Sequence, residues 1–183
     1  MQIFLTNPDF IYSATSLDKQ MCWKQTLKAK QLLSTLRYSQ CPNNWRATNM
    51  WIKQSYKNHP ASLMWVGYEE LLAHYYNCLL WHCKNVHKIR TTNVFIPSKY
   101  TIINKSCGLI FESMELTCGY FVHRNCENGK LPFWYDGEGL YLSHQAALIE
   151  KDRSFYLSKF PAADGFNGGN YVYPVAENNI VRL

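Results

Sequence analysis

The sequence predicts a mainly α-helical protein that forms a single compact domain over residues 1–183, with a few short strands or irregular segments. Its length of 183 residues suits one domain. Hydrophobic residues make up 47% of the chain and aromatic residues 15%, which is enough to build a buried core. Apolar residues also recur at helical spacing in several long segments.

The N-terminal region predicts an extended segment followed by a helix. Residues 1–15 read as an extended entry segment with a turn at 7–9. A long helix is then expected from an N-cap at Ser16 to about Arg37, because apolar side chains recur with helical periodicity. Gln25 stands out in this apolar stripe as an amide where an aliphatic residue is expected.

The rest of the chain predicts two more long helices. A short helix is expected near 45–56, and the longest helix at 60–84, where proline occupies the favoured first position. Residues 90–130 form a variable insert without a readable pattern. Helical character returns at about 139–151, and residues 152–183, rich in Pro, Gly and Asn, predict an irregular tail.

Positive charge is concentrated in the first half of the chain. The net charge is +6, but residues 1–100 hold 12 Lys/Arg against 4 Asp/Glu and carry +8, whereas residues 101–183 hold 7 against 9 and carry −2. A basic half favours contact with a polyanion, for which DNA or RNA is the usual candidate. The alternative is a soluble protein with an unevenly charged surface.

The sequence also predicts the compartment. No segment reaches the roughly 18–20 consecutive apolar residues of a membrane span, and the first residues lack the charged leader of a signal peptide. Seven cysteines without an export signal indicate a reduced, intracellular protein with no membrane partner.

Cysteine and histidine residues offer a possible metal site. Cys78 and His82 lie four positions apart, as do Cys83 and His87, and a further set is Cys107, Cys118, His123 and Cys126. Structural zinc sites usually contain two close cysteine pairs, and this chain has none. Buried free cysteines are common in aromatic cores, so neither a metal nor another cofactor is expected.

Two polar clusters are candidates for binding or catalysis. His59 follows Asn58 at a predicted helix start, where imidazole and backbone N–H groups suit a phosphate. The alternative is a capping or core histidine. In the second cluster, Glu138 could act as a general acid or base and His144 as a phosphate contact or proton carrier. The alternative there is a capped helix, with Asp136 just before its start.

Several segments together carry a family resemblance, in order over most of the chain with 90–130 as the gap. They are Met1–Leu5, Pro8–Phe10, Leu17–Asp18, Lys24–Gln25, Gln31–Leu33, Asn58–Ala61, Met64–Trp65, Gly67–Glu69, Leu71, Pro132, Trp134, Glu138, Leu140, Ser143–His144, Leu148, Lys151–Asp152, Phe160–Pro161, Tyr171–Val172 and Pro174. These segments resemble the pyrimidine-dimer DNA glycosylases of the endonuclease V-like family, in its bacterial and viral sub-group.

The resemblance implies a helical DNA-binding fold and a glycosylase with associated strand cleavage. In that chemistry an N-terminal amine, here that of Met1, forms an imine with the sugar of a flipped-out nucleotide. It further implies Glu69, Glu138 and His144 as catalytic groups. The residues expected to contact double-stranded DNA are Lys24, Gln25, Lys28, Lys57, Asn58, His59 and Trp134.

The chain departs from the family pattern where catalysis requires specific groups. Lys28 occupies the helix position at which the family has glutamate, and no glutamate precedes Glu69. Usual arginine positions hold Gln20, Met21 and Thr26. Loss of a general acid or base costs about 10²–10⁴ in rate, which argues against an efficient glycosylase.

Three hypotheses about function remain open. The chain is a glycosylase/lyase with weak or altered activity, a DNA-binding relative without catalysis, or a structural component of a virion or another large assembly with protein partners. The many Tyr and Trp residues suit a buried protein–protein surface in the third case.

Overall fold

Helices dominate the described part of the chain, which confirms the predicted fold class. The computed structural model describes residues 2–40, 56–96, 132–166, 170–176 and 179–182. The elements are α1 (Phe10–Thr15), α2 (Lys19–Gln40), α3 (Pro60–Leu63), α4 (Glu69–Asn85), α6 (Glu138–Lys151), α7 (Arg153–Tyr156), the 3₁₀ turn η4 (Pro161–Ala163), β1 (Val172–Ala176) and β2 (Asn179–Arg182). The predicted helix near 45–56 and most of the 90–130 insert lie outside the described residues.

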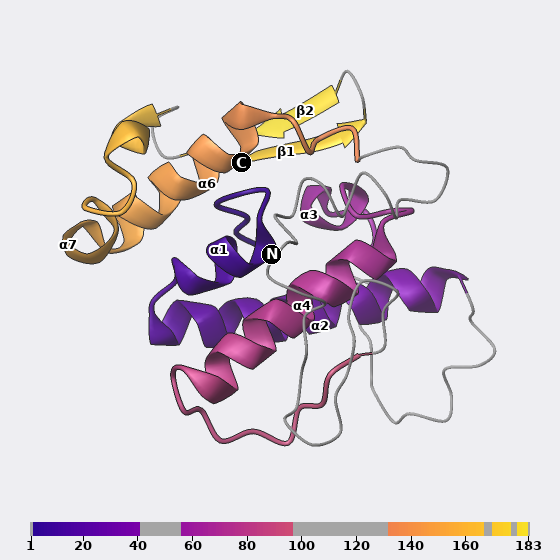
Figure 1. Ribbon diagram of the computed structural model, residues 1–183. Coiled ribbons are helices and arrows are strands. Elements are labelled where there is room, and N and C mark those ends of the chain that lie inside the picture. The colour runs from indigo at the N-terminus through magenta and orange to yellow at the C-terminus, as the bar shows by residue number, and fades with distance from the viewer. Residues whose placement is uncertain (1, 41–55, 97–131, 167–169, 177–178, 183) are drawn as a thin grey trace.

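Two long helices, α2 and α4, pack along each other and form one side of the fold (Figure 1). Their facing side chains are small or aliphatic and almost fully buried, including Cys22, Ala29 and Leu32 from α2 and Leu72 and Leu79 from α4. Small residues at such a contact allow close approach of two helices. No helix in the described ranges combines the length and apolar character needed to cross a membrane.

The N-terminal segment, residues 2–6, lies between the α2–α4 pair and α6 (Figure 1). Its buried N–H groups cannot bond to water, and each donates to a side chain of another element. The Ile3 N–H donates to the Tyr173 hydroxyl at 3.1 Å. The Phe4 N–H donates to Gln25 Oε1, and the Leu5 N–H to His144 Nδ1, both at 2.9 Å. The amide of Gln25 in the apolar stripe of α2 is therefore explained by its hydrogen bond to the buried backbone of the N-terminal segment.

Residues 10–15, predicted to be extended, form the short helix α1. The Asp9 carboxylate caps it by accepting hydrogen bonds from the Ile11 and Tyr12 N–H groups, at 2.8 and 3.0 Å. Ser16 ends α1 and does not begin α2. Asp18 caps α2 instead, because its Oδ1 accepts hydrogen bonds from the N–H groups of Gln20 and Met21, at 2.8 and 2.9 Å.

The helix predicted at 60–84 is broken into α3 and α4, so α2 is the longest helix of the described residues. Pro60 occupies the first position of α3, as predicted. The break lies at Gly67, which adopts φ +82°, a conformation that ends a helix and favours glycine.

The C-terminal region contains more regular structure than the predicted irregular tail. The helix predicted at 139–151 is present as α6, and α7 follows it directly. The tail also contains an antiparallel hairpin in which Val172 pairs with Arg182 and Tyr173 with Val181. Because β1 packs against both α3 and α6 and Tyr173 is fully buried, this hairpin closes the core over the N-terminal segment.

Candidate functional site

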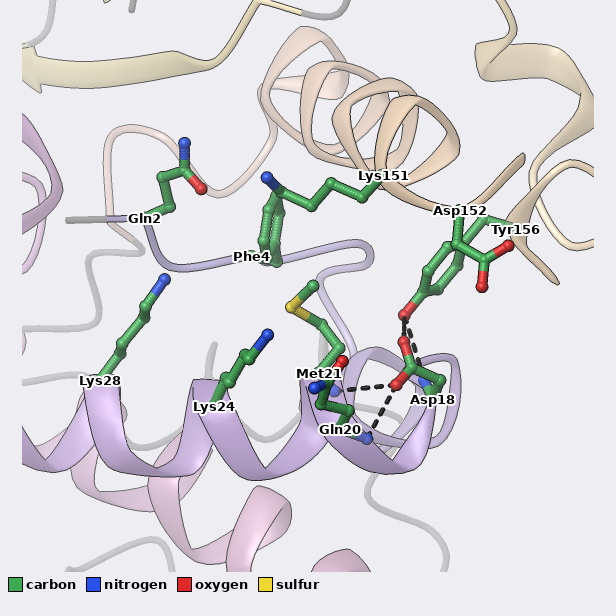
Figure 2. Close-up of a pocket in the computed structure, with 10 residues that line it drawn as sticks. All are labelled: Gln2, Phe4, Asp18, Gln20, Met21, Lys24, Lys28, Lys151, Asp152 and Tyr156. Atoms are coloured by element: carbon green, nitrogen blue, oxygen red, sulfur yellow. Dashed lines mark hydrogen bonds between the residues drawn. The ribbon is translucent and has the colours of Figure 1, made fainter. Parts of the chain in front are cut away.

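A cavity of about 400 Å³ opens between the N-terminal segment, α2 and the junction of α6 with α7 (Figure 2). Its lining combines three lysines with polar, acidic and aromatic side chains. They are Gln2, Phe4, Asp18, Gln20, Met21, Lys24, Lys28, Lys151, Asp152 and Tyr156. Ligand sites typically have volumes of about 300–1,000 Å³, so the cavity is large enough for a small ligand or for one nucleotide unit of a larger one.

The three lysines come from two helices. Lys24 and Lys28, one helical turn apart on α2, extend toward the N-terminal segment, and Lys151 extends from the end of α6 toward Phe4 (Figure 2). Lys24 and Lys151 are exposed, whereas Lys28 is half-buried. Among the described residues, none of these three ammonium groups forms a salt bridge. Their charge is therefore available to an anion from outside.

Electrostatics sets Lys28 apart from the other two lysines. Burial lowers the pKa of its amine below the ordinary value of 10.5, and the positive charges of Lys151 and Lys24 lower it further. Lys151 is held differently, because its ammonium lies 5.9 Å from the ring centroids of both Phe4 and Tyr171. Such cation–π contacts orient the group while leaving its charge intact.

The two carboxylates of the cavity are engaged in local structure. Asp18 caps α2 through Oδ1, and its Oδ2 accepts a hydrogen bond from the Tyr156 hydroxyl (Figure 2). Asp152 caps α7 and accepts from Ser154 Oγ at 2.7 Å, which lowers the pKa of its carboxyl group. With three lysines and two aspartates in its lining, the cavity has one more cation than anions.

The structure brings together only some of the residues predicted from the sequence. Lys24 and Lys28 line the cavity, as does Gln2. Met1, the predicted source of the reactive amine, lies outside the described residues. Gln25 is fully buried and faces the core, where it accepts the Phe4 N–H and is shielded from any nucleic acid.

Trp134 and His144 also lie in the core, away from the cavity lining. The Trp134 ring packs edge-on against Trp65, with the ring centroids 4.9 Å apart. Its Nε1–H donates to the Met64 carbonyl at 2.6 Å. His144 is fully buried, and its Nδ1 accepts the Leu5 N–H, so the proton of the neutral ring is on Nε2. Burial lowers the pKa of His144 to about 4. Both side chains are therefore buried in the core and hydrogen-bonded to its backbone.

The two predicted catalytic glutamates lie at helix starts outside the cavity lining. Glu69 begins α4, and its Oε1 accepts the Gly67 N–H at 3.1 Å. Glu138 begins α6 and is exposed. A carboxylate in the first turn stabilises the positive end of a helix, which accounts for both positions without catalysis.

The His59 cluster lies apart from the cavity lining as well. His59 is the N-cap of α3, and its Nδ1 accepts the Ala61 N–H at 3.1 Å. Burial lowers the pKa of its imidazole. Lys57 and Asn58 precede it and are exposed, so the capping role considered for His59 is the one that its geometry favours.

The cysteine and histidine pairs do not gather into a metal site in the described ranges, where no group of three or more candidate ligands is placed to hold an ion. Cys83 Sγ instead lies 3.2 Å from Cys22 Sγ between α2 and α4. His82 and His87 contact each other edge-on, with centroids 4.7 Å apart. The set Cys107, Cys118, His123 and Cys126 lies outside the described residues.

Residues that the sequence did not single out complete the cavity. Lys151, Asp152 and Tyr156 are more than 100 positions from Lys28, and no local pattern could have joined them to α2. One signal was present, since Lys151 and Asp152 belong to the segments that carry the family resemblance. Asp18 belongs to those segments too.

Comparison with known proteins supports that resemblance. The family model described as pyrimidine dimer DNA glycosylase matches residues 1–90, which include α1 to α4 and the Lys24 and Lys28 wall of the cavity. No curated protein and no solved structure matches the chain. The resemblance found in the sequence is therefore supported over residues 1–90, which are similar to the pyrimidine dimer DNA glycosylases.

Proposed function

We propose that this protein binds double-stranded DNA through the lysine cavity and is at most a weak glycosylase. The observation that carries the proposal is the convergence of Lys24, Lys28 and Lys151 on one cavity, without a salt bridge among the described residues. Lysine ammonium groups that neutralise phosphates release counterions, which supplies much of the affinity of proteins for DNA. The family match to DNA glycosylases supports DNA as the polyanion.

The same cavity explains why efficient base removal is not expected. General acid/base catalysis requires a carboxyl group that exchanges a proton with the reacting group. Asp18 and Asp152 are held by helix caps and hydroxyl groups, and hydrogen bonding lowers the pKa of the Asp152 carboxyl group. The Asp152 carboxylate is therefore a poor proton donor near neutral pH.

The alternative, a structural component of a virion or another assembly, has less support in the described residues. That role would favour aromatic side chains on the surface, but Trp65, Trp134 and Tyr75 are buried. The exposed large apolar residues there are mostly aliphatic, and Tyr12 and Tyr56 are the aromatic ones among them. No observation of the structure favours a protein partner over DNA.

A salt titration with matched variants tests the proposal. We expect Lys24→Gln and Lys151→Gln to weaken binding of a fluorescent duplex, measured by anisotropy at several salt concentrations. Each should reduce the slope of log K against log salt by about 1, because one phosphate contact is lost. The control is Lys19→Gln, which removes the same charge from an exposed position of α2 outside the cavity. Equal effects of all three substitutions would show that net charge, and not the cavity, governs binding.

A further inference from the structure

Two buried cysteines meet at the contact between α2 and α4, which pack along each other (Figure 1). Cys22 lies near the start of α2, and Cys83 lies in the last turn of α4, 61 positions later. Both side chains are fully buried, and their Sγ atoms are 3.2 Å apart. Because both thiols are free, the pair is a dithiol within hydrogen-bond distance.

Neighbouring groups hold the two thiols against each other. Cys22 Sγ also lies 3.6 Å from the Leu79 carbonyl, and Cys83 Sγ lies 3.4 Å from Thr26 Oγ1. The Thr26 hydroxyl donates to the Cys22 carbonyl at 2.9 Å, which fixes the hydroxyl beside Cys83. The bond of a disulfide is about 2 Å long, so the two sulfurs need to approach each other by only about 1 Å to form one.

We propose that Cys22 and Cys83 are an oxidative modification site, at which hydrogen peroxide converts the dithiol into a reversible disulfide between α2 and α4. A cysteine that a peroxide oxidises to a sulfenic acid condenses with a neighbouring thiol. A partner thiol already in contact makes this condensation effectively unimolecular, and therefore fast relative to a second oxidation. Neither cysteine lines the lysine cavity, so the inference does not depend on contact with DNA.

The two thiols differ in reactivity. The hydrogen bond between them lowers the pKa of the Cys83 thiol and raises the pKa of the Cys22 thiol. Because the thiolate is the nucleophile, Cys83 is expected to react with the peroxide and Cys22 with the sulfenic acid. Hydrogen peroxide is close to water in size, so small local openings of the folded core admit it while larger oxidants stay outside.

The reaction balances with hydrogen peroxide as the oxidant. The Cys83 thiolate attacks one oxygen of the peroxide, so that an S–O bond forms, the O–O bond breaks and the departing hydroxide takes up the thiol proton as water. The Cys22 sulfur then attacks Cys83 Sγ, so that the S–S bond forms and the hydroxyl group leaves with the Cys22 proton as a second water. Two electrons pass from the sulfurs to the peroxide, and a thiol reductant returns them.

The test treats the folded, reduced full chain with hydrogen peroxide and maps the product by chymotryptic digestion and mass spectrometry without reduction. Trp81 lies between Cys78 and Cys83, so chymotrypsin separates these two cysteines. We expect a peptide pair joined through Cys22 and Cys83 with the loss of two hydrogen atoms, and its disappearance on reduction. A bond between residues this far apart restricts the unfolded chain, and it should raise the melting temperature by about 5–15 °C.

Alanine variants separate this pair from other cysteine chemistry. In Cys22→Ala and in Cys83→Ala, peroxide should no longer raise the melting temperature. The control is Cys78→Ala, which removes a buried cysteine of α4 whose Sγ lies 3.8 Å from His74 Nε2. This variant should keep the full rise. Each variant is compared with its own reduced form, so the packing cost of the substitution cancels.

Several results would overturn the inference. They are free thiols at both positions after treatment, a sulfinic acid in place of the cross-link, a bond that maps to another cysteine, and an unchanged or lowered melting temperature of the cross-linked chain. Mapping of the unaltered protein decides the first three without any variant, so the test also holds if an alanine variant does not fold.

Discussion

His144 is expected to make the stability of the protein depend on pH, and substitution by asparagine isolates this effect. The ring is fully buried, and its Nδ1 accepts the Leu5 N–H at 2.9 Å. In His144→Asn the side-chain oxygen takes the place of Nδ1 and keeps an acceptor for that N–H, but it has no proton to gain. The variant therefore separates titration from hydrogen bonding.

The magnitude follows from the two pKa values of the histidine. Burial lowers the pKa to about 4 in the folded protein, against an ordinary value of 6.5 in the unfolded chain. The unfolded state therefore binds more protons between these values. The contribution of His144 is fully present above pH 6.5 and is lost as the pH falls toward 4. Between pH 7 and pH 5 this loss amounts to about 2 kcal/mol.

The assay is urea unfolding at pH 7 and pH 5, followed by circular dichroism. The unaltered protein should lose about 2 kcal/mol more between the two pH values than His144→Asn does. The smaller asparagine lowers the stability at both pH values, so this packing cost cancels in the difference. His74 and His82 also have pKa values lowered to about 4, and their contributions cancel as well because both proteins contain them.

His59→Asn is the matched control. His59 is a less buried histidine at an N-cap, a position that asparagine also favours. It should change the pH dependence less than His144→Asn does, because solvent screens the charge of a partly exposed ring. If His144→Asn and the unaltered protein lose equal stability on acidification, the buried neutral histidine is not the cause of the pH dependence.

Four further predictions concern stability and are measured by urea or thermal unfolding at pH 7. Gly67→Ala should cost about 1–2 kcal/mol, because φ +82° strains any L side chain although an added Cβ meets nothing within 4 Å. Gly139→Ala, at an equally open position inside α6, should instead stabilise by up to about 1 kcal/mol, and a loss there would contradict the argument. Asp9→Ala should destabilise by about 1 kcal/mol through loss of the α1 cap, whereas Asp9→Asn should retain most of the stability. Tyr156→Phe removes a hydroxyl that donates to Asp18 Oδ2 and accepts the Asp18 N–H, and it should cost about 1–3 kcal/mol. A cost near zero would mean that water replaces the hydroxyl there.

The helices were predictable where side-chain periodicity and packing agree. The apolar stripe of α2 faces the core as its spacing predicted. The single helix expected at 60–84 was wrong because the apolar pattern continues through the break, and only Gly67 marked it. The helix α1 was missed because Asp9 was read as part of a turn, although an N-capping carboxylate before an apolar residue also fits a helix start.

The candidate site was predictable only on the α2 side. Lys24 and Lys28 follow from the resemblance and from their spacing on one helix, whereas Lys151 and Tyr156 reach the cavity through tertiary packing. Gln25 illustrates a partner that local sequence cannot reveal. Its amide stood out in the apolar stripe of α2, and its oxygen accepts the N–H of Phe4, 21 positions earlier.

The anchoring of the N-terminal segment has a consequence for biosynthesis. The Ile3 N–H bonds to Tyr173, 170 positions later, and the Leu5 N–H to His144, 139 positions later. At about 5–20 residues per second, a ribosome needs on the order of ten to thirty seconds to make the intervening chain. During that time the apolar residues Ile3, Phe4 and Leu5 have no finished core to enter. During co-translational folding, the N-terminal segment therefore reaches its native hydrogen bonds only after His144 and Tyr173 have been made.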